Sequence, residues 1–177
     1  MGYTLVAKCG DGIFLQLESL LNKSGVKSNK IPFGRDCDRE AADNLLPYHM
    51  TVFHWGKAYD SLYLERIREL HFAPFRIEVT GVQVMSAEEG SSLLFFEVKP
   101  GDGFYSLKEE LGTALGVHLS AFWHITLAVS KNRGEIESQR KLLNDALSFP
   151  FQVDINELDL FHIWKPVYLA QAFYADR

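Results

Sequence analysis

The stretch that decides the fold of this chain is PYHMTVFHWG, residues 47–56. β-Branched and aromatic residues fill it, with proline at its start and glycine at its end, which is typical of a β-strand. Residues two apart on a strand point to the same face. We therefore expect His49 and Thr51 to share one face of this strand, with the apolar residues between them on the other.

The same layout returns 75 residues later in FWHITLAV, residues 122–129. Here His124 and Thr126 would share a face in the same way. In both stretches an aromatic residue, Tyr48 or Trp123, comes directly before the histidine, and strand alternation predicts that it packs into the core. One His-x-Thr pair is common by chance, but two in matching predicted strands indicate a duplicated unit.

Two further matches support the duplication. Residues 10–14 (GDGIF) match residues 101–105 (GDGFY) at an offset of 91, and residues 74–79 (PFRIEV) match residues 150–155 (PFQVDI) at an offset of 76. The first half therefore holds 16 extra residues (91 minus 75) before its His-x-Thr strand. They fall in a long irregular segment, residues 27–46, which is long enough to suggest a lid or a recognition loop.

The apolar periodicity predicts one order of elements for each half: strand, helix, His-x-Thr strand, helix, strand. Helices are expected near residues 13–23, 60–70, 104–115 and 134–147. We predict an α+β fold with two pseudo-symmetric β-α-β-α-β lobes, whose antiparallel sheets flank a central cleft. Lobe one would span about residues 1–85, including the 27–46 insert, and lobe two about residues 91–177. Together they form one domain of 177 residues.

The composition narrows the class of protein. Hydrophobic residues make up 47% of the chain and charged residues 23%, as in ordinary globular proteins. The net charge of -5 argues against a broad surface that coats nucleic acid, but it permits a local pocket for one phosphate or an RNA end. Cys9 and Cys37 have no metal-ligand spacing, which favours inert thiols in a reduced, cytoplasmic protein. No apolar run reaches membrane-spanning length, and we expect a monomer with no membrane partner.

Two histidines on opposite sides of one substrate can perform both proton transfers of a hydrolysis. The ordinary pKa of histidine is about 6.5, so one imidazole can take a proton from water while the other delivers a proton to the leaving oxygen. Each transfer is typically worth about 10²–10⁴ in rate. Threonine hydroxyls on the same face can donate hydrogen bonds to phosphate oxygens. This chemistry suits a strained 2′,3′-cyclic phosphate and needs no metal.

The paired motifs, HMTV at residues 49–52 and HITL at residues 124–127, resemble the signature of the two-histidine phosphoesterases. That family includes the 2′-5′ RNA ligase-like proteins and cyclic nucleotide phosphodiesterases. The resemblance extends to the chain length, the order of elements and Gly56 at the end of the first motif strand. It implies a bilobal fold with both histidines in a central cleft, no cofactor and no metal. We assign the base role to His124 and the acid role to His49, and the near-symmetry leaves the reverse open.

The predicted function is the metal-independent hydrolysis of a cyclic phosphodiester, such as a 2′,3′-cyclic phosphate or a related nucleotide, or of a 2′-5′ linkage. Ligase-like members often carry an arginine shortly after the second motif, where this chain has Val129. Ligase activity and the natural substrate therefore stay open. One alternative is a non-catalytic protein that binds an RNA end or a nucleotide in the same cleft. A histidine-based metal protein is a weaker third reading, because the motifs supply no carboxylate or cysteine ligands.

Five further residues are candidates for substrate contact. Lys30, Phe33 and Arg35 lie in the long loop, where they could contact phosphate and base, although a solvated surface loop explains each of them equally well. Phe53 follows the first motif and could stack on a base, with a packed aromatic residue as the other reading. His162 lies on the predicted last hairpin and could border the groove.

Overall fold

The strands of this chain form a single antiparallel sheet in the computed structural model. The structure describes residues 3–9, 12, 17, 19–20, 48–55, 65–67, 69–87, 90–116, 123–162 and 173–174. Within them the sheet has the order β6-β3-β4-β5-β2-β1-β7-β8. The strands are β1 (Tyr3–Lys8), β2 (His49–Trp55), β3 (Phe75–Ser86), β4 (Ser92–Pro100), β5 (His124–Ser130), β6 (Phe151–Ile155), β7 (Glu157–His162) and β8 (Phe173–Tyr174).

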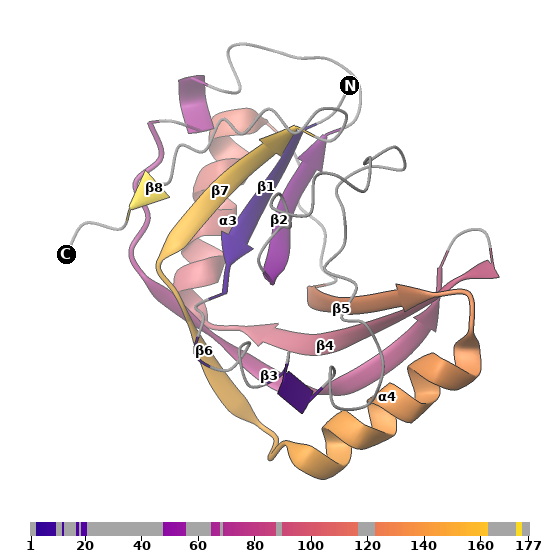
Figure 1. The fold of residues 1–177 in the computed structure, drawn as a ribbon. Coiled ribbons are helices and arrows are strands. Elements are labelled where there is room, and N and C mark those ends of the chain that lie inside the picture. The colour runs from indigo at the N-terminus through magenta and orange to yellow at the C-terminus, as the bar shows by residue number, and fades with distance from the viewer. Residues whose placement is uncertain are drawn as a thin grey trace.

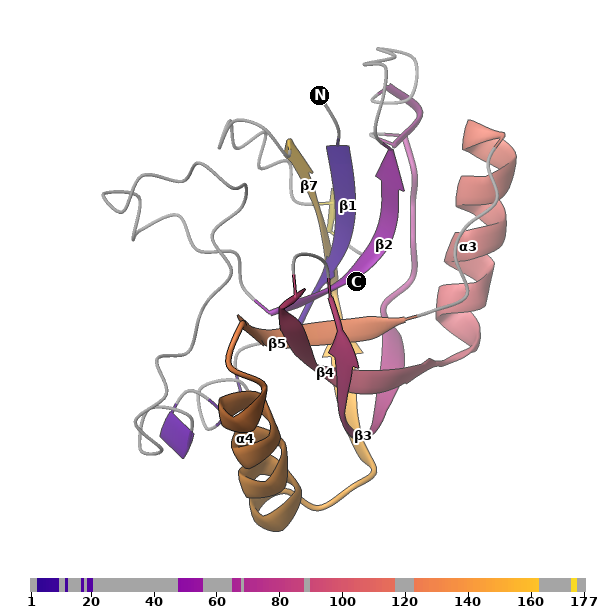
Figure 2. The ribbon, with the colours of Figure 1, turned by 90° about the vertical axis from the view of Figure 1, so that its right-hand side faces the viewer.

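The two His-x-Thr strands, β2 and β5, lie side by side in the middle of this sheet. The sheet bends between β2 and β5, so that the strands on its two sides run at a steep angle to each other. In both views β1, β2 and β7 stand steeply on the half made of β3, β4 and β5 (Figures 1 and 2). The α+β fold with antiparallel sheets in two halves, expected from the sequence, is confirmed.

Each half of the sheet is completed by a strand from the other half of the chain. β3, from the first half of the sequence, pairs with β4 and β6, while β7, from the second half, pairs with β1. Only Asn156 separates β6 from β7. Because β6 is the strand at one edge of the sheet and β7 lies near the other edge, this short connection brings the two ends of the sheet together. The predicted boundary near residues 85–91 therefore separates two halves of the sequence and does not coincide with the join between the two halves of the sheet.

The strand registers support the duplication. At the offset of 75, Met50 corresponds to Ile125, and these two residues are the pair at which β2 meets β5. At the offset of 76, Ile77 corresponds to Val153, and these two are paired where β3 meets β6. A residue can be paired with its own counterpart only where a local twofold axis passes between them. Two such pairs are what a duplicated chain folded about one pseudo-twofold axis would give.

Two helices are described along most of their length, α3 (Asp102–Leu115) and α4 (Arg133–Ala146). Both agree with the predicted ranges to within two residues. α3 lies behind β1 and β2 in Figure 1 and beside β2 in Figure 2, and α4 covers the core face of β3, β4 and β5. In the two other predicted helices, the described residues 17, 19–20 and 65–67 are helical. Within the described part of the chain, no helix has the length and apolar character needed to cross a membrane.

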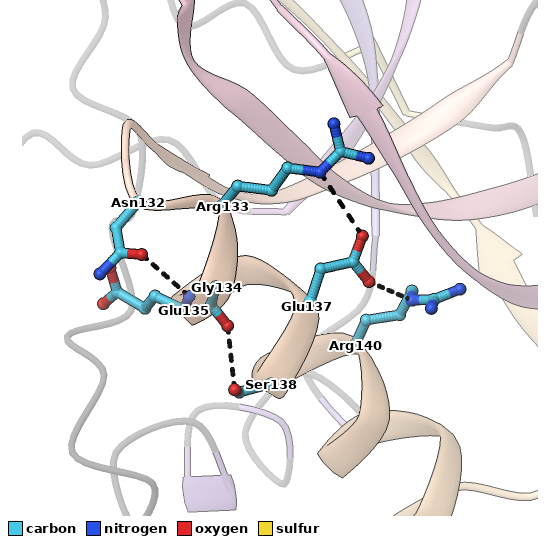
Figure 3. Close-up of polar contacts among 7 residues, drawn as sticks. All are labelled: Asn132, Arg133, Gly134, Glu135, Glu137, Ser138 and Arg140. Carbon is cyan, nitrogen blue, oxygen red and sulfur yellow. Dashed lines mark hydrogen bonds and ion pairs between the residues drawn. The ribbon is translucent and has the colours of Figure 1, made fainter.

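The turn from β5 into α4 is fixed by a helix cap. The side chain of Asn132 accepts a hydrogen bond from the backbone N–H of Glu135 at 3.3 Å (Figure 3). Ser130, the last residue of β5, donates to the Glu135 carboxylate at 3.0 Å. The end of the second motif strand is thereby tied to the first turn of α4. Figure 3 also draws contacts of the next turn, which involve Arg133, Gly134, Glu137, Ser138 and Arg140.

Candidate active site

The four predicted catalytic residues lie on one face of the sheet. β2 and β5 meet at the pair Met50–Ile125, and both of these side chains are fully buried in the core. Because neighbours along a strand point to opposite faces, the residues on either side of this pair face away from the core. Those residues are all half-buried, and they are His49, Thr51, His124 and Thr126.

The antiparallel register arranges these four residues as a square. The structure pairs β2 with β5 at Met50–Ile125, and an antiparallel register extended by one residue each way would set His49 opposite Thr126 and Thr51 opposite His124. In a regular antiparallel pair, opposite residues have Cβ atoms about 4.5–5.5 Å apart, and diagonal neighbours are about 7–8 Å apart. The histidines occupy one diagonal and the threonines the other. A phosphate placed over the centre would have an imidazole on two sides and a hydroxyl on the other two.

Both motif strands carry a β-bulge at the same place. The register between β1 and β2 skips Val52, and the register between β4 and β5 skips Leu127. Each of these residues lies three positions after its histidine and directly after its threonine. Bulges bend a strand and re-aim its side chains, and they are frequent beside active sites. Matching bulges in matching positions also agree with the duplication.

On one side, β1 borders the square. Lys8 stands opposite His49, and Val6 stands opposite Thr51, so both share the face of the motif residues. The Lys8 ammonium forms a 2.8 Å ion pair with Glu157 on β7. This side of the site therefore holds two kinds of group. One is the Lys8 amine, which is already engaged in its ion pair with Glu157, and the other is the small, buried aliphatic side chain of Val6.

On the other side, β4 supplies different chemistry at the matching positions. Glu97 stands opposite His124, and Phe95 stands opposite Thr126. The Glu97 side chain is exposed, and its carboxylate accepts a hydrogen bond from the Thr80 hydroxyl at 3.3 Å. The ring of Phe95 lies edge-on to the His124 imidazole, with 5.5 Å between centroids and 72° between planes. The two sides of the square thus differ.

The protonation of His124 follows from its position. Burial lowers the pKa of His124 below its ordinary value of 6.5, because a partly desolvated site disfavours the charged imidazolium. The neutral imidazole therefore predominates at neutral pH. A neutral imidazole is the form that can accept a proton from water.

The aromatic residues that precede the two histidines pack into the core, as predicted. Trp123 is 7% exposed and lies edge-on to Phe104 of α3, with 4.6 Å between ring centroids. The ammonium of Lys108 lies 5.7 Å from the centre of the Trp123 ring. Tyr48 packs against the core, and its carbonyl accepts the backbone N–H of Cys9 at 3.0 Å. These contacts fix the start of each motif strand.

The sequence predicts that both cysteines are inert. Cys9 is buried and its thiol is free, and burial raises the pKa of this thiol to about 12, so it stays protonated and unreactive. Cys37 lies outside the described residues. Across the described part of the chain, no group of three or more His, Cys, Asp and Glu side chains is arranged to hold a metal ion.

The predicted substrate-binding residues have different outcomes. Lys30, Phe33 and Arg35 lie outside the described residues. Phe53 is half-buried and packs against the core cluster, which agrees with its reading as a packed aromatic residue. Its stacking on a base stays a prediction.

The structure does not bring His162 to the square. His162 pairs with Tyr3 at one end of β1, whereas His49 pairs with Lys8 at the other end. The two rows lie five positions apart on β1, which corresponds to about 17 Å along the strand. A sequence pattern that places a residue on a hairpin gives no information about which row of the sheet it joins.

Comparison with known proteins finds similar solved structures but no match to a protein family or to a curated sequence. No family model matches the chain, and no curated protein matches it. The structure of TT0787 from Thermus thermophilus is similar with a TM-score of 0.56 and 18% identity, over 100% of both chains. The structure of Kluyveromyces marxianus Usb1 is similar with a TM-score of 0.50 and 14% identity, over 98% of this chain and 97% of that one, as is its structure with uridine monophosphate.

These similarities extend over the whole chain, so the fold of this protein is that of the two matched structures. At 14% to 18% identity they establish the fold alone. The activity has to be argued from the square of histidines and threonines.

Proposed function

We propose that this protein is a metal-independent phosphoesterase that hydrolyses a 2′,3′-cyclic phosphate, a related cyclic nucleotide or a 2′-5′ linkage. The observation that carries the proposal is the β2–β5 register at Met50–Ile125, which gathers both His-x-Thr motifs on one face. The motifs are far apart in the sequence, so their convergence is a property of the fold. The nucleotide class is supported by the structure of Kluyveromyces marxianus Usb1 with uridine monophosphate, a similar fold that holds a nucleotide.

The reaction uses the two histidines in opposite protonation states. Neutral His124 takes a proton from a water molecule, whose oxygen attacks the phosphorus and forms the new P–O bond. The bond from phosphorus to the leaving oxygen breaks, and protonated His49 gives its proton to that oxygen. One water is consumed for each ester bond cleaved. His124 ends protonated and His49 neutral, and exchange with solvent resets both. The lowered pKa of His124 favours this assignment.

The threonines stabilise the charge that develops on phosphorus. Thr51 and Thr126 occupy the other diagonal of the square, so their hydroxyls can donate to the two non-bridging oxygens. In-line attack needs the base and the acid on opposite sides of the phosphorus, and the histidine diagonal provides two such sides. Hydrogen bonds that are already in position cost no reorganisation when the charge appears.

The experiment is hydrolysis of a panel of 2′,3′-cyclic mononucleotides and 2′-5′ dinucleotides, followed by ³¹P NMR and chromatography, with and without EDTA. We expect turnover that EDTA does not change. His49→Ala and His124→Ala should each lower kcat by about 10²–10⁴. His71→Ala is the matched control: this histidine is exposed and lies before β3, and its loss should leave kcat unchanged.

Wild-type rates in either catalytic variant would contradict the proposal. Tight binding of the same nucleotides with no turnover would instead support a nucleotide-binding protein that uses this face. A rate that EDTA abolishes and added metal restores would favour the metal-dependent reading.

A further inference from the structure

We propose that Phe95 is a positioning residue, which holds the imidazole of His124 in the orientation needed to accept a proton from the attacking water. This inference rests on the proposed function, because it concerns the base of that reaction. The inference goes beyond the proposed function by naming the side chain that orients the base.

Phe95 lies on the site face of the sheet and not in the main core. It is 6% exposed, yet it does not belong to the main core cluster, which contains its neighbours Leu94 and Phe96. Strand alternation explains this, because Phe95 pairs with Thr126 and so points to the face that carries the motif residues. Phe95 is therefore a buried aromatic ring on the face of the sheet that carries the motif residues.

The ring of Phe95 contacts the imidazole of His124. The two ring centroids are 5.5 Å apart, and the planes meet at 72°. Such an edge-to-face arrangement is a favoured geometry for two aromatic rings and restricts the rotation of both. The phenyl ring also removes water from one side of the imidazole. It therefore favours one orientation and the neutral form together.

The position that corresponds to Phe95 beside the first motif holds a different residue. Val6 takes the position on β1 that Phe95 takes on β4, since each stands opposite the threonine of its motif. Val6 has no ring to place against His49. The two corresponding positions therefore carry different side chains, an aromatic ring beside the second motif and an aliphatic group beside the first. That difference supplies a physical reason for different proton-transfer roles.

Titratable groups face His124 from the neighbouring strands. The titratable groups that face His124 from the neighbouring strands are Glu97 on β4 and His49 on β2, with Lys99 one step farther along β4 on the same face. A carboxylate opposite His124 would favour the imidazolium, which is the opposite of the effect of burial. The apolar contact with Phe95 contributes to the burial of the imidazole and so acts in favour of the neutral base.

The test is Phe95→Leu, compared with wild type in two measurements. The first is a titration of His124 followed by its imidazole resonance in NMR, which does not depend on turnover. The second is kcat/KM across pH with a 2′,3′-cyclic mononucleotide. We expect the His124 titration to move upward toward 6.5. A histidine at its ordinary value is about one quarter neutral at pH 6.0, so protonation alone can lower activity there by up to about fourfold.

At pH 8 the same variant should lose kcat by about tenfold or more with little change in KM, because a loose base affects the transition state and not ground-state binding. Phe96→Leu is the matched control. Phe96 is the next residue on the same strand, is fully buried, and packs on the opposite face against Phe149 and Phe151. It should lower the melting temperature without moving the His124 titration.

Phe95→Met keeps most of the side-chain volume and removes the ring, so it serves if the leucine variant does not fold. Phe95→Tyr keeps the ring and should restore the wild-type titration. An unchanged His124 titration in both ringless variants would overturn the inference while leaving the proposed function standing. An inactive wild-type protein whose His124 titration still moves would instead contradict the proposed function alone.

Discussion

The pH dependence of hydrolysis is the sharpest consequence of the site. His124 must be neutral to act as the base, and its burial lowers its pKa below 6.5. The acid limb of the kcat/KM profile reports this group in the free enzyme. We therefore expect the half-maximal point of that limb below pH 6.5. Below the half-point, activity should fall tenfold for each pH unit.

The size of the effect can be worked from the neutral fraction. A histidine with an unshifted pKa of about 6.5 is about one quarter neutral at pH 6.0. Wild-type kcat/KM at pH 6.0 should therefore exceed about one quarter of its plateau value. The assay is initial-rate hydrolysis of a 2′,3′-cyclic mononucleotide between pH 5 and 9 at constant ionic strength. A half-point at or above pH 6.5 would refute the reasoning that burial keeps the base neutral.

The same group has a counterpart in stability. The unfolded chain binds a proton at His124 near pH 6.5, while the folded chain binds it only at lower pH. The contribution of His124 is then complete above pH 6.5 and declines as the pH falls from 6.5 through the lowered pKa. Urea unfolding of wild type and His124→Gln at pH 7.5 and at pH 5.5 should show the wild type losing more stability at the lower pH.

Two further predictions concern the square. Thr51→Val and Thr126→Val keep the side-chain shape and remove the hydroxyl, so each should lower kcat by about 10²-fold with little change in melting temperature. Steady-state kinetics and calorimetry measure the two quantities. Unchanged kcat in both variants would exclude the threonines from the reaction. Met50→Ala removes a fully buried side chain at the pair that joins the two halves of the sheet, so it should cost about 2–5 kcal/mol in denaturant unfolding; a loss well under 1 kcal/mol would show that the join does not depend on this packing.

Much of the fold could be predicted because the sequence repeats its own pattern. The two His-x-Thr stretches, the helix α3 with its apolar residues at three- and four-residue steps, and the alternation in β6 all follow from local spacing. The half-buried histidines and threonines, alternating with buried apolar neighbours, follow from the same rule. Local spacing fixes which way a side chain points along its own strand.

Local spacing does not fix which strand lies beside which. β3 and β7 each pair with a strand of the other half of the chain, and no pattern within either segment indicates that exchange. For the same reason the sequence did not reveal Lys8, Phe95 or Glu97 as neighbours of the motif residues. Leu93 to Phe96 is an unbroken apolar run, so its two faces could not be separated before the register was known.

The proposed function requires that two imidazoles, distant in sequence, converge on one phosphorus atom. A crystal structure with a uridine–vanadate complex, which mimics the five-coordinate phosphorus, tests it most directly. We expect the vanadium above the Met50–Ile125 pair, with an imidazole nitrogen of His49 and one of His124 each within about 3 Å of a vanadate oxygen. Density for the ligand elsewhere, or contact with one histidine alone, would contradict it.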